Sequence, residues 1–321
     1  ANEASQNVDD NVKQEILDAI SNLALNRYPD TTCHELHDLY ANIMNVPSSW
    51  ILSGNGSDQM LGFLIQYYVQ GNKTLYTLAP DFSMYDYYVE LNHAKIEKFE
   101  TALDGSFDVD AFISNGKDKK VDMILFSNPN NPTGHAISKL EMIQICEAFS
   151  NIPVIFDEAY MEFGNESAID LLKTYPMVFV CRTLSKAYGL AGIRCGFMIS
   201  SQVEQLAPLF IPYALNSVIQ TIVSVVLRHA DAYKANIAAI ISERERIYRE
   251  VKDYKTISFY PSNANFLYGR TDKKDILMDM FKEKNITIRN YADTSFRITI
   301  GTNEENEMVL DVLRRFDYEN S

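Results

Sequence analysis

The stretch MILFSNPNNPTG, residues 123–134, decides the fold of this 321-residue chain. Four apolar residues come first, and a polar turn with two prolines and a glycine follows them. A strand that is apolar on both faces is typical of a mostly parallel sheet covered by helices on both sides. The run VIFDEAY, residues 154–160, repeats this arrangement with Asp157 directly after the apolar residues. Ligands of such sheets bind beyond the carboxyl ends of the strands, so we expect a site where these two runs end.

Working outward from these two runs, short β-like segments alternate with helical segments over most of the chain. The pattern predicts strands at 73–78, 95–99, 122–126, 154–157, 177–182 and 195–199, with helices such as 82–91 and 138–149 between them. The character changes near residue 230, where a long helix over 232–251 leads into shorter strands and helices. The predicted strands there are 257–260, 265–268, 286–289 and 296–300, and the predicted helices are 272–284 and 304–316. We therefore expect an α/β fold, with a large domain over 28–230 and a small α+β domain formed by 1–27 together with 231–321.

Helix boundaries can be placed from local capping patterns. Apolar residues at helical spacing between 12 and 25 predict a first helix that ends near Arg27. Thr32 and Glu35 form a capping-box pattern for a second helix, and Ser138 and Glu141 form one for the helix over 138–149.

Composition excludes several classes of protein. Hydrophobic residues are 46% and charged residues 22% of the chain, as in ordinary globular proteins. With 29 Lys and Arg against 43 Asp and Glu, the net charge is 29 − 43 = −14. Such an acidic chain repels a phosphate backbone, so we expect no nucleic-acid partner. The most apolar stretch, residues 206–227, is interrupted by Pro208, Pro212, Asn216 and Gln220, so we expect no membrane span.

The cysteines and histidines predict neither a metal site nor disulfides. No pair among the four cysteines has the C-x-x-C spacing, and the histidines are not clustered with them. Free cysteines in an acidic chain without a recognisable leader predict a cytoplasmic protein.

Four polar segments lie at predicted strand ends or at a helix start: residues 127–134, 157–160, 183–186 and 56–58. A lysine such as Lys186, flanked by an apolar strand and small residues, can form an imine with an aldehyde. An acid such as Asp157, buried at a strand end, can hold the proton of a pyridinium ring. The helix start at Gly56, together with Ser, Thr and Arg side chains, can bind a phosphate dianion. Together these groups point to pyridoxal phosphate as the cofactor.

At this point the sequence resembles a known family. The strings NPNNPTG (128–134), DEAY (157–160), RTLSKAYGLAGIRCGF (182–197) and FRITIGT (296–302) are similar to those of the fold-type I aminotransferases, specifically the histidinol-phosphate aminotransferase branch. The resemblance covers nearly the whole chain. It implies a large domain with a mostly parallel central sheet, a small α+β domain, pyridoxal phosphate, and two half-reactions with an amino donor and a 2-oxo acid.

The resemblance assigns roles to the residues that contact the cofactor ring. It implies that Lys186 forms the imine with the cofactor and then moves the substrate proton, and that Asp157 pairs with the ring nitrogen. Asn131 and Tyr160 would donate hydrogen bonds to the phenolate oxygen. Phe82 aligns with an aromatic residue, more often Tyr in the family, that stacks on the ring.

Further roles concern the cofactor phosphate, the partner subunit and the substrate. The resemblance implies that the phosphate is bound by the segment Gly56, Ser57 and Asp58 together with Thr183, Ser185 and Arg194. Tyr28 matches a tyrosine that reaches the cofactor phosphate of the neighbouring subunit, which implies a homodimer with shared sites. Arg297 and Arg289 are similar to the clamp for the substrate anion. Asn2 lies in a segment near the substrate, where ANEAS departs from the family's ANEN-type start.

Three alternatives remain open. An aromatic or broad-specificity aminotransferase would use the same residues with a different amino donor. A decarboxylase of a phosphorylated amino acid, such as threonine phosphate, would keep Lys186 and Asp157 but break another bond. A regulator that binds pyridoxal phosphate without catalysis usually carries a helix-turn-helix segment, and no such segment is recognisable in the sequence.

Overall fold

The computed structural model describes residues 2–164 and 166–321 and contains two sheets. Ala1, the first residue of the predicted small domain, lies outside the described residues. The larger sheet has seven strands in the order β1-β7-β6-β5-β4-β2-β3. Neighbours from β6 to β3 are parallel, whereas β7 is antiparallel to both β6 and β1. The strands are β1 (Ile51–Gly54), β2 (Thr74–Ala79), β3 (Lys95–Glu100), β4 (Met123–Ser127), β5 (Val154–Asp157), β6 (Val178–Thr183) and β7 (Gly196–Ile199).

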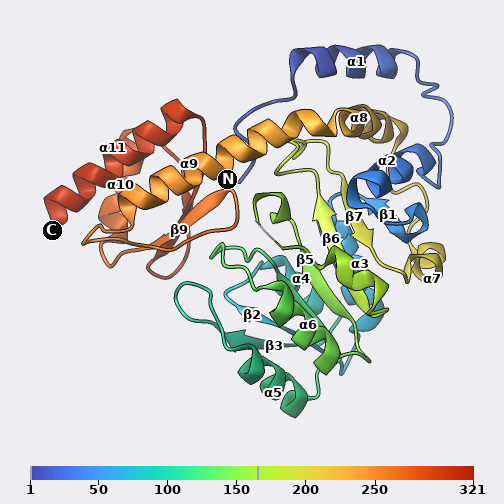
Figure 1. Cartoon of the computed structure of the whole chain (residues 1–321), viewed down its shortest axis with the longest axis horizontal. Helices are drawn as coiled ribbons and strands as arrows, with labels where there is room; N and C mark the ends of the chain where they lie inside the picture. The colour runs from blue at the N-terminus through green and yellow to red at the C-terminus, as the bar shows by residue number, and fades with distance from the viewer. Residues whose placement is uncertain (1, 165) are drawn as a thin grey trace.

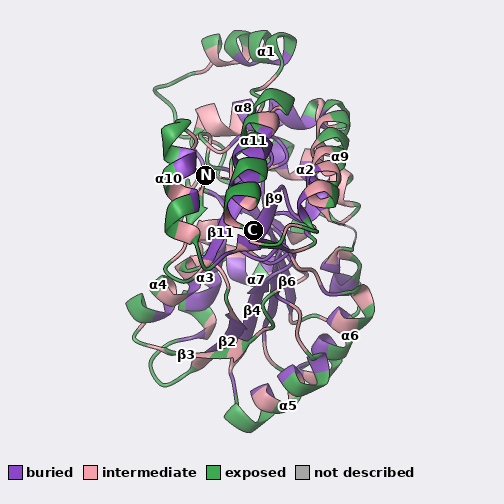
Figure 2. Ribbon diagram, turned by 90° about the vertical axis from the view of Figure 1, so that its left-hand side faces the viewer, coloured by how far each residue is buried: buried purple, intermediate pink, exposed green. Residues whose placement is uncertain are grey.

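Helices cover both faces of this sheet, because its central strands are apolar on both sides. Alternate residues of β4 point to opposite faces, so Ile124 packs in one core and Leu125 in the other. One face is covered by α3 (Ser57–Tyr68), α4 (Met84–Leu91) and α7 (Val203–Leu206). The other is covered by α2 (His34–Met44), α5 (Val109–Lys119), α6 (Lys139–Ala148) and α8 (Ser217–Arg228). Figure 2 shows the buried strands at the centre and the exposed sides of the helices turned outward.

The second sheet belongs to the C-terminal part of the chain. Its strands are β8 (Ser258–Phe259), β9 (Phe266–Arg270), β10 (Arg289–Asn290) and β11 (Ser295–Thr299), all antiparallel in the order β10-β11-β9-β8. It shares a separate apolar core with α10 (Lys274–Glu283) and α11 (Asn303–Asn320). The long helix α9 (Tyr233–Val251) contributes to this core and also contacts the core of the large sheet, so it joins the two units (Figure 1).

The N-terminal helix α1 (Asp10–Ser21) packs with the large unit. Its buried residues Val12 and Ile16 belong to the core that α8 shares with the large sheet. This helix lies against α8 (Figure 1). The division into a large domain over 28–230 and a small domain of 1–27 with 231–321 stays a prediction. Among the described residues, no helix has the length and apolar character that crossing a membrane requires.

Three local predictions differ from the structure, and one is confirmed. The first helix ends at Ser21 rather than near Arg27. Of the strand predicted over 286–289, only Arg289 lies in a strand, the short β10 (Arg289–Asn290). The Thr32–Glu35 capping box is wrong, because Asp30 takes its place: one carboxylate oxygen of Asp30 accepts from the Thr32 N–H and the other from the His34 N–H, both at 2.9 Å. The Ser138–Glu141 capping box is confirmed at the start of α6.

Candidate active site

A cavity of about 190 Å³ lies where β4, β5 and β6 end and α3 begins. The three strands are parallel, so their carboxyl ends meet at one edge of the sheet and bring together residues far apart in the sequence. The residues that line the cavity are Asn2, Ser57, Asp58, Phe82, Ser127, Asn131, Asp157, Ala159, Tyr160, Thr183, Ser185, Lys186 and Arg194. All of them except Ser127 and Ala159 are site residues that the sequence analysis predicts.

Asp157 is the last residue of β5, and its side chain is buried. Its Oδ2 accepts a hydrogen bond of 2.8 Å from the Tyr85 hydroxyl. Its Oδ1 is also buried but has no hydrogen-bond partner among the described residues. Burial raises the pKa of Asp157 to about 7, and the Tyr85 hydrogen bond acts against that rise. An unpaired buried carboxylate oxygen is costly, so this atom is suited to accept from a cationic N–H in the cavity.

Lys186 extends into the same cavity from the loop after β6. Its Nζ donates to Asn2 Oδ1 at 2.9 Å and lies 5.8 Å from the centroid of the Tyr160 ring. Burial, and next the nearby charge of Arg297, lower the pKa of Lys186 to about 8. A lysine with this pKa is partly neutral near pH 8, and only the neutral amine is a nucleophile.

Asn131 and Tyr160 present hydrogen-bond donors to the cavity. Arg297 Nη1 donates to Asn131 Oδ1 at 2.5 Å, which fixes the amide so that its NH₂ group remains for another acceptor. The Tyr160 hydroxyl accepts from the amide of Asn2. Burial raises the pKa of Tyr160 to about 12, so the hydroxyl keeps its proton and can donate it.

The start of α3 forms an anion-binding corner of the cavity. Gly56 precedes the helix with φ +81°, and a Cβ at this position would lie 2.7 Å from Arg194 Nη2. Gly196 on β7 approaches so closely that a Cβ there would collide with the backbone of Gly56 and Ser57. Arg194 Nη2 also donates to Asp58 Oδ2 at 2.8 Å. First-turn N–H groups of a helix have no intrahelical partner, so they are available to an anion beside the guanidinium.

Two hydroxyl groups complete this corner. Thr183, the last residue of β6, donates from its Oγ1 to Ser185 Oγ at 3.0 Å, and its Oγ1 accepts from the Ser185 N–H at 3.2 Å. Both side chains are buried and line the cavity. The arrangement of helix N-terminus, guanidinium and hydroxyls suits a phosphate dianion.

Comparison with known proteins identifies the family. The family model described as aminotransferase class I and II matches residues 1–313. The histidinol-phosphate aminotransferase of Clostridium novyi is 31% identical over 328 residues, covering 99% of this chain and 91% of that protein. That of Pyrococcus furiosus is 33% identical and covers 98% of this chain and 90% of that protein.

The chain belongs to the class I and II aminotransferases. Solved structures agree with this assignment in fold. The histidinol-phosphate aminotransferase of Clostridium acetobutylicum superposes with a TM-score of 0.89 at 22% identity, over 99% of this chain and 98% of that one. The predicted fold and the predicted enzyme class, a pyridoxal phosphate-dependent aminotransferase, are confirmed.

The cavity of this aminotransferase fits its cofactor on three independent observations. The unpaired Asp157 Oδ1 can accept from a protonated ring nitrogen. The corner at Gly56 and Arg194 can bind the phosphate, and Lys186 Nζ lies within the same cavity. The part of the chain that the structure describes holds no cluster of three or more His, Cys, Asp or Glu side chains arranged for a metal ion.

Four predicted site residues lie outside the lining of the cavity. Gly56 is next to it, directly before Ser57. Arg297 is buried and reaches the site through Asn131. Arg289, its cross-strand neighbour on β10, is exposed, and its guanidinium lies 5.6 Å from the centroid of the Tyr291 ring. Tyr28 is 82% exposed and stacks on Tyr213, with 4.8 Å between ring centroids.

Two polar residues that contact this site have no role assigned from the sequence. Tyr85 donates to Asp157, and Ser127 lines the cavity at the end of β4. Tyr85 lies three positions after Phe82, in the first turn of α4. Ser127 is the first polar residue after an apolar run. Both signals are common in proteins and point to no particular chemistry by themselves.

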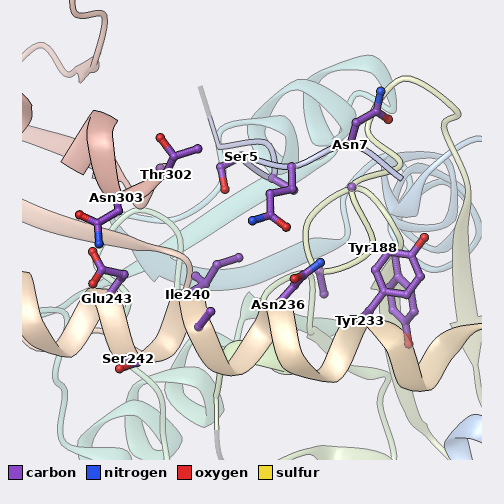
Figure 3. A pocket seen from close by; sticks show the side chains of 16 residues that line it. Ser5, Asn7, Tyr188, Tyr233, Asn236, Ile240, Ser242, Glu243, Thr302 and Asn303 are labelled. Atoms are coloured by element: carbon purple, nitrogen blue, oxygen red, sulfur yellow. The ribbon is translucent and has the colours of Figure 1, made fainter. Parts of the chain in front are cut away.

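A second cavity, of about 370 Å³, is lined in part by the N-terminal segment that carries Asn2. Its walls are residues 4–7, the loop 187–189 after Lys186, α9, and the start of α11. Figure 3 shows amide and hydroxyl side chains around it, among them Ser5, Asn236 and Asn303. The segment that carries Asn2 into the active site therefore also forms one wall of this cavity.

Proposed function

We propose that this aminotransferase transfers the amino group of histidinol phosphate to 2-oxoglutarate, a step of histidine biosynthesis. The names of the curated relatives, which align over nearly their whole length, support this substrate pair. In the structure, the proposal rests on the burial and the hydrogen bonding of the Arg297 guanidinium.

Arg297 is a buried cation beside the cofactor cavity. Its side chain is 5% exposed, its Nη1 donates to an amide, and its Nε has no hydrogen-bond partner among the described residues. The guanidinium also lies over the Phe266 ring, with Cζ 4.8 Å from the centroid. A buried guanidinium that contacts an amide rather than a carboxylate is ready to bind an anion from the substrate. In the proposed reaction this anion is the phosphate of histidinol phosphate in one half-reaction and a carboxylate of glutamate in the other.

The remaining residues take the following roles in the proposal. Bound pyridoxal phosphate supplies an aldehyde that receives the amino group and a ring that stabilises negative charge at the adjacent carbon. Asp157 Oδ1 holds the proton on the ring nitrogen. With the cofactor bound, Lys186 Nζ would be the base that takes the proton from the substrate carbon bearing the amino group and the acid that gives it back to the cofactor carbon bonded to the same nitrogen. Asn131 and Tyr160 would donate hydrogen bonds to the ring oxygen, and Phe82 would stack on one face.

The proposal includes a homodimer in which Tyr28 reaches the cofactor phosphate of the partner subunit. Tyr28 is exposed in the single chain, which supports a role outside its own cavity. A groove of about 960 Å³ runs along α3, α4 and residues 209–212 and includes Asp58 at the active site. Its rim carries the exposed apolar side chains Leu91, Leu209 and Ile211. A second copy would cover these side chains, because large exposed apolar patches mark interaction surfaces.

The proposal also places the protein in the cytoplasm. The four cysteines are free and buried, as in proteins from reducing compartments. Fractionation of cells that produce the protein tests this assignment.

A substrate panel tests the reaction. The holoenzyme is incubated with 2-oxoglutarate and, in turn, histidinol phosphate, phenylalanine, tyrosine or threonine phosphate, and both glutamate and CO₂ are measured. We expect glutamate to be formed, and we expect kcat/KM to be highest when histidinol phosphate is the amino donor. Preference for phenylalanine or tyrosine would indicate the aromatic aminotransferase. Release of CO₂ from threonine phosphate would indicate the decarboxylase, and a cofactor band that no amine changes would indicate the regulator.

A further inference from the structure

A second acid, Asp81, is half-buried next to the active site but does not line the cavity. It follows the end of β2, two residues after Ala79. Burial raises the pKa of Asp81 to about 8, and hydrogen bonds from Ser127 and Phe82 act against that rise. A carboxyl group that is partly removed from water needs hydrogen-bond partners, so the partners of Asp81 indicate what it does.

One branch of these contacts leads to Phe82. Asp81 Oδ1 accepts from the Phe82 backbone N–H at 2.7 Å. This bond fixes the backbone from which the Phe82 ring enters the cavity. Because the ring is the proposed stacking partner of the cofactor, a loose backbone here would weaken the contact with one face of the cofactor.

The other branch leads through Ser127 to Asn131. Asp81 Oδ2 accepts from the Ser127 N–H at 3.1 Å, and the Ser127 hydroxyl donates to Asp81 Oδ1. Since the hydroxyl proton points to Asp81, the lone pairs of Ser127 Oγ remain for other donors. The Asn131 backbone N–H uses one of them at 2.9 Å. Asn131 is thereby held at its backbone by this branch and at its amide oxygen by Arg297.

We infer that Asp81 is a positioning residue that holds Phe82 and Asn131, the proposed face and edge contacts of the cofactor ring, through a single half-buried carboxyl group. An amide cannot replace it. Backbone N–H groups point at both carboxylate oxygens, so an amide NH₂ would face one of them in either orientation. The inference rests on the cofactor contacts proposed above for Phe82 and Asn131.

The chain offers a matched control at the opposite end of the same two strands. Asp122 Oδ2 accepts from the Thr74 N–H at 2.8 Å and so ties the start of β4 to the start of β2. Asp81 ties the ends of the same strands. Asp122→Asn therefore removes a comparable acid from the same strand pair without touching the cavity.

The test uses the holoenzymes of the wild type and of Asp81→Asn, Ser127→Ala, Asn131→Ala and Asp122→Asn. It measures the pH midpoint of the absorption change of the bound cofactor and the rate at which the cofactor is lost on dilution. A hydrogen bond from Asn131 to the phenolate oxygen of the cofactor would keep the pH midpoint of this absorption change low. Its loss should raise that midpoint by about one pH unit.

We expect Asp81→Asn to raise the midpoint and to accelerate cofactor loss about tenfold, because both branches are broken. Ser127→Ala breaks only the Asn131 branch, so it should raise the midpoint and change the rate of loss less than about twofold. Asp122→Asn should change neither quantity. Because Ser127→Ala keeps the carboxylate, it tests the Asn131 branch even where Asp81→Asn does not fold.

The outcomes separate this inference from the proposed contacts. A raised midpoint in Asn131→Ala together with unchanged midpoints in Asp81→Asn and Ser127→Ala would overturn the positioning role alone. An unchanged midpoint in Asn131→Ala would overturn the proposed contact of Asn131 and this inference with it. An Asp122→Asn variant that reproduces the Asp81→Asn midpoint would show a general effect of the strand pair, which also overturns the inference.

Discussion

At the scale of single residues, burial changes the protonation of the two groups most central to the proposed chemistry. Lys186 has its pKa lowered to about 8, and Asp157 has its pKa raised to about 7. In both cases the cause that contributes most is the removal of the charged form from water. The cofactor fits this environment because it accepts the neutral amine and supplies a cation for the acid.

The lowered pKa of Lys186 predicts how cofactor uptake depends on pH. Below about pH 8 the neutral fraction of the amine falls tenfold per pH unit. We expect the rate of reconstitution of the apo protein with pyridoxal phosphate to rise from pH 6 to pH 8 and to level off above. Stopped-flow absorbance measures this rate. Lys186→Ala is the control, since it binds the cofactor without the covalent step, and an identical pH profile in that variant would contradict the prediction.

The raised pKa of Asp157 predicts a conflict between stability and function. The unfolded carboxyl ionises near pH 3.8 and the folded one near 7, so between these values the folded state holds more protons. The stability of the apo protein then falls through this window as pH rises. Asp157→Asn should remove the cost and raise the free energy of unfolding of the apo protein by about 1–3 kcal/mol at pH 8, with little change at pH 4.

The same variant should lose catalysis. An amide cannot hold the ring proton, so kcat of the Asp157→Asn holoenzyme should fall by about 10³-fold or more. Urea titrations of both apo proteins at the two pH values and steady-state kinetics measure the two effects. Equal or lower stability of the variant at pH 8 would show that Asp157 is not a buried acid with an unpaired oxygen.

Residues that carry cofactor chemistry could be predicted from the sequence, whereas those that hold them in place could not. Lys186 and Asp157 lie in strings that few other functions require together. Asp81 and Tyr85 are ordinary residues whose importance comes from contacts with Ser127 and Asp157 across 46 and 72 positions. Such long-range contacts depend on the order of the strands, which periodicity does not reveal.

At the scale of elements, strands were easier to predict than helix boundaries. The strand predicted over 154–157 matches β5 because its four residues are all buried and apolar up to the final acid. The Thr32–Glu35 cap failed because Asp30 accepts from the Thr32 N–H, which the Glu35 side chain would have to bind, and also from the His34 N–H. The stretch 206–227 is interrupted by Pro208, Pro212, Asn216 and Gln220, but its second half forms helix α8, whose apolar face packs in the core of the large sheet.

The start of α3 gives a prediction at this scale. Gly56→Ala places a Cβ at φ +81° and 2.7 Å from Arg194 Nη2, so it both strains the backbone and crowds the anion corner. We expect the dissociation constant for pyridoxal phosphate to rise at least about tenfold, with a loss of stability of about 1 kcal/mol. Equilibrium titration of the apo protein and urea unfolding measure these two quantities.

Gly71 supplies the control for that substitution. It has φ +61°, but a Cβ there would meet nothing within 4 Å. Gly71→Ala should therefore reproduce the loss of stability and leave cofactor affinity unchanged. If both variants bind the cofactor as the wild type does, the helix start is not the phosphate site.

At the scale of the whole molecule, the exposed Tyr28 can serve either the active site of its own subunit or that of a partner subunit. In the single chain this ring stacks on Tyr213, beside the groove whose rim is apolar. The cavity itself contains Asn2 from one end of the chain and Arg194 from the large unit, but not Tyr28. A dimer that covers the groove would bring the tyrosine of one copy toward the phosphate corner of the other, because Asp58 lies in both the groove and the cavity.

Mixed dimers test this arrangement. Lys186→Ala alone should be inactive, and Tyr28→Ala alone should have weak cofactor affinity, so both homodimers have low activity at limiting pyridoxal phosphate. When the two variants are unfolded together and refolded, about half of the dimers are hybrids. If Tyr28 acts across the interface, each hybrid contains one site with Lys186 from one chain and Tyr28 from the other, and that site is intact. We expect about a quarter of wild-type activity in the mixture, whereas a Tyr28 that serves its own subunit would leave every site defective and the mixture no more active than its parts.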